Sequence, residues 1–139
     1  MVGFDHVALS AYGKNGALQF KDNHFTSTND TLITKIQNED FDCSIFIGTD
    51  PISHLPLSLS SKLVKKPIIL IDNHKNATYE FANIVLPTAI TGIECEGLAY
   101  RLDHIPIEVK KILNPPNKIP TDADLLTTII QKIKPNRGS

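Results

Sequence analysis

Two short apolar runs, each followed by a polar turn, constrain the fold of this chain more than any other feature. The run 43–47 ends in Gly48-Thr49-Asp50-Pro51, and the run 68–71 ends in Asp72-Asn73-His74. Runs rich in β-branched residues are typical of strands that are buried on both faces, as in a parallel sheet. Between them, 56–65 places leucines at roughly helical spacing, which predicts a crossover helix.

The surrounding patterns complete an α/β prediction. A third strand is expected at 83–87, and a packing helix over 32–37 that begins at Asn29 or Asp30. We therefore expect a three-layer, Rossmann-like α/β domain with a mainly parallel sheet.

The two ends of the chain are expected to add smaller elements. Short strands are predicted at 7–9 and 17–20, and a short terminal hairpin from 98–101 and 105–109. Thr121 and Asp124 resemble a capping box for a last helix, which carries an apolar stripe from Leu125 to Ile133.

Length and composition are those of one ordinary soluble domain. The 139 residues with 41% hydrophobic content fit a single α/β domain over 1–136, and 137–139 read as a tag remnant. A net charge of −1 gives no indication of a nucleic-acid partner, and no apolar run reaches membrane-spanning length. The two cysteines have no metal or redox spacing, so we expect a cytoplasmic protein with free thiols.

The polar turns after the first two strands are the expected site. Ligands of parallel sheets gather at the carboxyl edge, and the candidate binding residues there are Gly48, Thr49, Asp50, Asp72, Asn73 and His74. A glycine after a buried strand allows close backbone approach, and an aspartate can accept hydrogen bonds from guanine or ribose. The alternative is equally open: Asp50-Pro51 only starts a turn, and Asp72 to His74 only satisfy loop backbone.

Other candidates for chemistry are weaker. The dinucleotide-binding, phosphate-loop and nucleophile-elbow motifs are absent. A metal site from His54, His74 and Asp72 is a minor hypothesis, and we assign no metal ligands and no catalytic residues. Glu94 and Glu96 in a loop are more often solvated than catalytic, and Cys43, within a predicted buried strand, reads as inert packing.

Several spaced motifs nevertheless occur in one order along the chain. Asp50-Pro51 precedes His54 and Pro56, the segment 82–87 reads Ala-Asn-Ile-Val-Leu-Pro, and Glu94, Glu96-Gly97 and the segment 100–103 follow. Together they resemble the molybdopterin-dependent oxidoreductases, and within them the B-type subunits of formylmethanofuran dehydrogenase.

The resemblance implies a domain that binds part of a molybdopterin guanine dinucleotide cofactor carrying molybdenum or tungsten. In the full enzyme that cofactor would reduce CO2 on the way to formylmethanofuran. The implied partners are the remainder of the catalytic subunit and the other formylmethanofuran dehydrogenase subunits. In this reading Gly48-Thr49-Asp50 and Asp72 to His74 face the guanosine and diphosphate.

The chain also departs from the family pattern. Asn83 stands where the family usually has an acid, and Cys95 interrupts the glutamate motif. The amino-terminal cysteine cluster and a metal-ligating cysteine are missing, so the chain alone is not expected to turn over substrate. Two interpretations therefore stand: a cofactor-binding domain, which alone need not carry the cofactor, and a protein-interaction domain of the same fold that has lost it.

Overall fold

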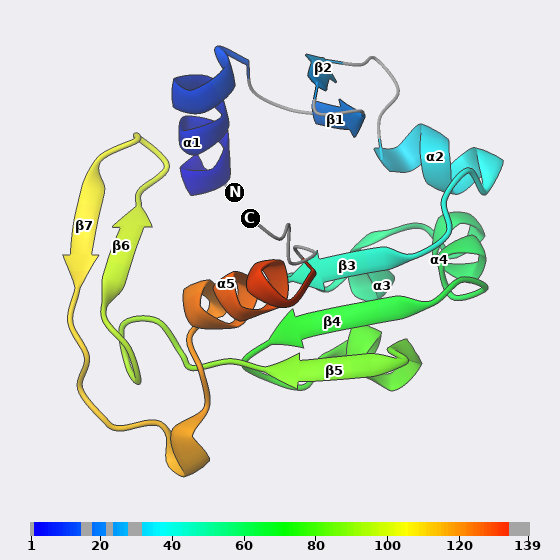
Figure 1. The fold of residues 1–139 in the computed structure, drawn as a ribbon. Helices are drawn as coiled ribbons and strands as arrows, with labels where there is room; N and C mark the ends of the chain where they lie inside the picture. The colour runs from blue at the N-terminus through cyan, green and yellow to red at the C-terminus, as the bar shows by residue number, and fades with distance from the viewer. Residues whose placement is uncertain (1, 15–17, 22–23, 28–31, 134–139) are drawn as a thin grey trace, which may run out of the picture.

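A three-stranded parallel sheet forms the centre of the protein, whose computed structural model describes residues 2–14, 18–21, 24–27 and 32–133 (Figure 1). Its strands lie in the order β3-β4-β5 and span Ser44–Ile47, Ile68–Asp72 and Ile84–Pro87. The predicted α/β class with a parallel sheet is confirmed.

One face of this sheet carries the hydrophobic core. Helices α3 (Pro51–His54) and α4 (Leu57–Leu63) connect β3 to β4, and the 3-10 helix η1 (Ala77–Phe81) connects β4 to β5. Together with α2 (Leu32–Asn38) they supply and surround a buried cluster of Ile36, Phe46, Leu59, Leu63, Ile68 and Leu70. The core therefore lies directly behind the strands whose ends carry the predicted site.

The crossover helix buries only some of the leucines that are predicted to face the sheet. Leu59 and Leu63 are buried, whereas Leu57 is 82% exposed. Successive residues turn by about 100° around a helix, so Leu57 points roughly 200° away from Leu59. Leu57 therefore lies on the solvent face.

The opposite face of the sheet corrects the prediction that the strands are buried on both sides. Ile71 of the central strand is buried there, but Ile45, Ile47 and Ile84 of the outer strands are 60%, 44% and 50% exposed. Helix α5 (Asp122–Ile133) lies in front of the sheet in Figure 1, and none of its residues is fully buried. Only the central strand thus has cover on both faces.

The N-terminal segment differs from the prediction. Residues 7–9, predicted as a strand, belong to helix α1 (Val2–Tyr12), because a three-residue apolar run does not distinguish a strand from a helix. The strand predicted at 17–20 is found as β1 (Leu18–Lys21), paired antiparallel with β2 (His24–Ser27). The predicted helix-capping residues Asn29 and Asp30 lie outside the described residues.

The C-terminal elements follow the prediction closely. Strands β6 (Gly97–Tyr100) and β7 (Pro106–Val109) form the antiparallel hairpin, and a 3-10 turn, η2 (Pro116–Lys118), precedes α5. The Thr121 hydroxyl accepts a hydrogen bond from the Asp124 amide at 3.1 Å and donates one to the Asp124 carboxylate at 2.8 Å, so the predicted cap forms. No helix in the described part of the chain is both long and apolar enough to span a membrane.

Candidate functional site

The two predicted turns meet at the carboxyl edge of the sheet. Ile47 pairs with Ile71 in parallel register, and the Gly48 amide donates to the Ile71 carbonyl at 2.9 Å. A pocket of about 220 Å³ opens there, which we call the Thr49 pocket; its lining is Gly48, Thr49, Asp50, His54, Asp72, His74 and Asn76. The structure thus brings five of the six predicted binding residues into one pocket.

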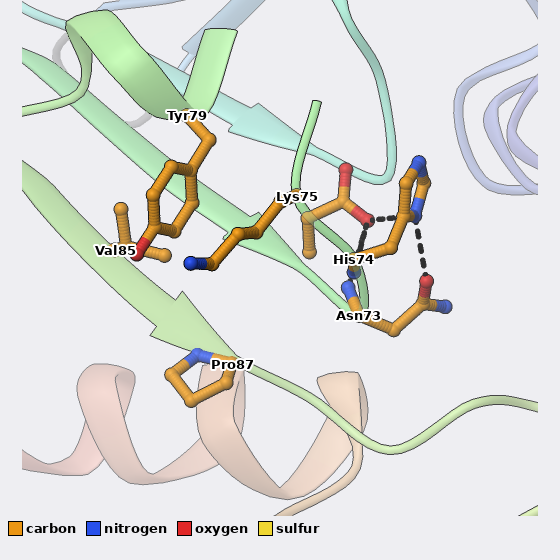
Figure 2. Close-up of a pocket in the computed structure, with 7 residues that line it drawn as sticks. Asn73, His74, Lys75, Tyr79, Val85 and Pro87 are labelled. Atoms are coloured by element: carbon orange, nitrogen blue, oxygen red, sulfur yellow. Dashed lines mark hydrogen bonds and ion pairs between the residues drawn. The ribbon is translucent and has the colours of Figure 1, made fainter. Parts of the chain in front are cut away.

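A second pocket lies on the other side of the Asp72 turn, over β5. It has a volume of about 350 Å³, and we call it the Tyr79 pocket (Figure 2); its lining is Asp72, Asn73, His74, Lys75, Tyr79, Val85 and Pro87. It contains Asn73, the remaining predicted residue, and shares Asp72 and His74 with the Thr49 pocket. The turn that follows β4 is therefore a wall common to both pockets.

The Asp50 carboxylate is held by four hydrogen bonds from within the protein. Its Oδ1 accepts from the Thr78 hydroxyl at 2.6 Å and from the Thr78 amide at 3.0 Å. Its Oδ2 accepts from the Ser53 hydroxyl at 2.5 Å and from the Ala77 amide at 3.2 Å. A carboxylate has about four lone-pair sites, so the capacity of Asp50 is filled. These contacts match the turn-forming alternative from the sequence; reading guanine would require giving one up.

The same contacts control the ionisation of Asp50. Partial burial raises the pKa of its carboxyl, but the hydrogen bonds from Ser53, Thr78 and Ala77 outweigh it and hold the pKa well below its usual range. Asp50 is therefore a fixed negative charge that ties α3 to η1.

Asp72 is a second internal anchor. It is only 6% exposed, and its Oδ1 accepts from the amides of Asn73 at 2.7 Å and His74 at 3.3 Å. Its Oδ2 accepts from the Asn76 side-chain amide at 2.9 Å. The carboxylate therefore shapes the turn, and its neighbours are the residues that face outward.

The His74 imidazole is oriented by this anchor. Its Nδ1 lies 3.0 Å from Asp72 Oδ1 and 2.9 Å from Asn73 Oδ1, as the dashed lines in Figure 2 show. A carboxylate only accepts, so Nδ1 carries the hydrogen and Nε2 stays available to a ligand. The His74 side chain is 67% exposed at the shared wall of the pockets.

Sequence reasoning missed Lys75 and Tyr79. The Lys75 ammonium lies 5.0 Å from the centre of the Tyr79 ring, beside which it extends in Figure 2. The signal was available, because both residues follow β4 closely along the chain at the site-bearing edge of the sheet. They add a cation and an aromatic face to a site predicted only from small polar residues.

The weaker candidates do not form a comparable site. Glu94 and Glu96 line a separate pocket of about 410 Å³, but the Glu94 carboxylate accepts from the Ile90 amide at 2.9 Å and so closes its own loop. Among the described residues, no group of three His, Cys, Asp or Glu side chains is placed to hold a metal. Cys43 precedes β3 and is exposed, so its reading as buried packing is wrong; Cys95 is half-buried, and both are free thiols.

Comparison with known proteins bears directly on this arrangement. The chain is 38% identical over 109 residues to the B-type subunit of the tungsten-containing formylmethanofuran dehydrogenase 2 of Methanocaldococcus jannaschii. It is 37% identical over 108 residues to the protein of the same name from Methanococcus maripaludis. The chain is similar to part of the B-type subunit of formylmethanofuran dehydrogenase. The matches cover 78% of this chain and 24% of each relative, so the chain spans about a quarter of the length of these curated relatives.

A solved structure supports the fold. A chain of the formyltransferase/hydrolase complex from Methylorubrum extorquens, determined with methylofuran, superposes with a TM-score of 0.72 over 94% of this chain and 36% of that one. The two are 16% identical, so this likeness concerns the fold alone. No family model matches the chain.

The departure at Asn83 has a structural explanation. Its side-chain oxygen accepts from the Ile68 amide at 2.8 Å, and its own amide donates to the Ile68 carbonyl at 2.9 Å. An asparagine oxygen fills this acceptor position as an aspartate oxygen would. The substitution therefore leaves the start of β4 intact.

Proposed function

We propose that the chain binds the guanine nucleotide end of a molybdopterin guanine dinucleotide cofactor at the carboxyl edge of β3 and β4. The observation that carries the proposal is the meeting of the two turns in the Thr49 pocket, on a chain that resembles a formylmethanofuran dehydrogenase subunit. Pockets at this edge of a parallel sheet are the usual ligand sites of α/β folds.

The residues present fit the polar part of such a cofactor. The Thr49 hydroxyl and His74 Nε2 offer hydrogen bonds to a phosphate or ribose, and Lys75 adds a positive charge next to them. Gly48 has a φ of +58° and no atom within 4 Å of where a Cβ would lie, so the backbone stays open to a ligand. Asp50 and Asp72 act through the turns that they hold.

The chemistry of the full enzyme is a proposal at a further remove. The relatives are named as tungsten-containing dehydrogenase subunits, and the metal-pterin group would supply the redox chemistry there. For this chain we propose binding, with the remainder of a catalytic subunit and the other dehydrogenase subunits as partners, and no catalysis by the chain alone.

Titration calorimetry of the full 139-residue chain with GDP tests the proposal. We expect a dissociation constant of about 1 mM or tighter. Thr49→Val should weaken binding by about fivefold because it removes one hydrogen bond to the ligand. Thr127→Val, on exposed α5, is the matched control and should leave the affinity unchanged. Absence of heat with millimolar GDP, or equal affinities for both variants, would contradict the proposed site.

A second function is favoured by one observation. Ile45, Ile47 and Ile84 leave an apolar strip exposed on the sheet face opposite the core. Parallel sheets are nearly always covered on both faces, and exposed apolar surface marks interaction sites. A protein-interaction domain without cofactor would use this strip, and its sign would be self-association that is indifferent to GDP in size-exclusion chromatography.

A further inference from the structure

The Tyr79 pocket has the form of a purine site. The Tyr79 ring forms one wall and Pro87 lies across the pocket from it, with Val85 beside them (Figure 2). A volume of about 350 Å³ is at the lower end of small-molecule pockets, which run from about 300 to 1,000 Å³. It is suited to one planar ring system, and aromatic side chains stack on nucleobases of any sequence.

Lys75 adds a means of choosing between purines. Its ammonium lies 5.0 Å from the Tyr79 ring centre, so it stands where the edge of a stacked base would lie. An ammonium can only donate hydrogen bonds. Guanine presents two acceptors, O6 and N7, on one edge, whereas adenine presents N7 beside an amino donor. Lys75 therefore favours guanine.

Asp50 is not free for this task. All four of its hydrogen-bonding positions are occupied by Ser53, Ala77 and Thr78, and it does not line the Tyr79 pocket. The sequence alone points to this carboxylate as the group that recognises guanine. The structure leaves the role to a residue on the next turn.

We infer that the guanine base lies against Tyr79 with its O6 and N7 edge read by Lys75, while the phosphate lies across His74 in the Thr49 pocket. This inference rests on the proposed function and specifies how the ligand is oriented and selected. It assigns selectivity to Lys75, stacking to Tyr79 and phosphate contact to Thr49.

The test compares GMP, AMP and ribose 5-phosphate as probes in titrations of the full chain followed by NMR. The wild-type protein should prefer GMP over AMP by about tenfold, as expected for a donor that matches two acceptors. Lys75→Met should bring the two affinities to within about twofold of each other by weakening GMP alone. Lys110→Met, on an exposed lysine of the hairpin region that lines neither pocket, should leave the preference unchanged.

Tyr79 variants test the stacking separately. Tyr79→Leu should weaken GMP and AMP by about tenfold each and leave ribose 5-phosphate unaffected, because the sugar phosphate has no base to stack. Tyr79 also packs against the core, so Tyr79→Phe, which keeps the ring, accompanies it and should bind both nucleotides like the wild type.

The possible results separate this inference from the proposed function. GMP binding at the Thr49 pocket with a preference that survives Lys75→Met would overturn the inference and leave the proposed function standing. Equal wild-type affinity for GMP and AMP would have the same meaning. Absence of binding by all three probes at millimolar concentration would overturn both.

Discussion

The Thr78 hydroxyl donates a hydrogen bond to Asp50 Oδ1 at 2.6 Å and accepts one from the Ile52 amide at 3.2 Å. The two side chains thus cap each other's helices: Asp50 receives the amides at the start of η1, and Thr78 receives an amide at the start of α3. Thr78 has no exposed surface. This pair fixes the distance between the β3 turn and the segment that carries Tyr79.

Thr78→Val tests the importance of this pair for stability. The substitution keeps the shape of the side chain but removes its hydroxyl, which takes a hydrogen-bond partner from both the Ile52 amide and Asp50. We expect the free energy of unfolding in urea to fall by about 1–3 kcal/mol. Thr127→Val on α5 should stay within about 0.5 kcal/mol of wild type. A similarly small effect of Thr78→Val would show that the pair is dispensable.

The Asp50 carboxylate should make stability depend on acid. Its pKa is lowered in the folded protein from the ordinary 3.8, so its contribution is fully present above that value and is lost as pH falls toward the folded pKa. The difference in urea midpoint between wild type and Asp50→Asn should therefore be largest near pH 6 and shrink below pH 3.8. Asp42→Asn removes a charge from an exposed position and serves as the control. A difference that grows on acidification would contradict this assignment.

Asp72 should hold the turn that separates the two pockets. Asp72→Ala removes the acceptor for the Asn73 and His74 amides, so hydrogen exchange at these two amides should accelerate by about tenfold or more. Asp122→Ala, in the first turn of α5, changes an aspartate that lines neither pocket and should leave these two rates unchanged. Unchanged rates in Asp72→Ala would mean that the turn is held by other contacts.

Gly48 separates the effect of backbone strain from that of steric clash. Its φ of +58° strains most side chains, but no atom lies near the position of a Cβ. Gly48→Ala should cost about 1–2 kcal/mol in unfolding free energy. Gly48→Asn should cost less, because asparagine tolerates the left-handed region. Equal losses for both variants would indicate a clash instead of strain.

The sequence predicted the central sheet because its information is local there. The β-branched runs around Ile45 and Ile69 and the polar turns after them indicated the strands, and parallel pairing then placed the turns at one edge. The apolar stripe from Leu125 to Ile133 predicted α5 in the same way.

The remaining features depend on contacts between distant segments. Two partners of Asp50 are 27 and 28 residues away at Ala77 and Thr78, so no local pattern indicates that its carboxylate is already occupied. The same holds for Lys75 and Tyr79, which form a pocket only once β5 brings Val85 and Pro87 opposite them. The helix at 7–9 was missed because three apolar residues fit either structure.

Chemical-shift mapping of the full chain with GDP tests the central claim most directly. Binding at the carboxyl edge of the sheet predicts shifts at the amides of Gly48 to Asp50 and of Asp72 to Lys75, with smaller changes elsewhere. Residues 97–109 of the β6–β7 hairpin provide an internal reference and should not move. Shifts confined to other segments, or no shifts at millimolar GDP, would contradict the claim that this edge binds a guanine nucleotide.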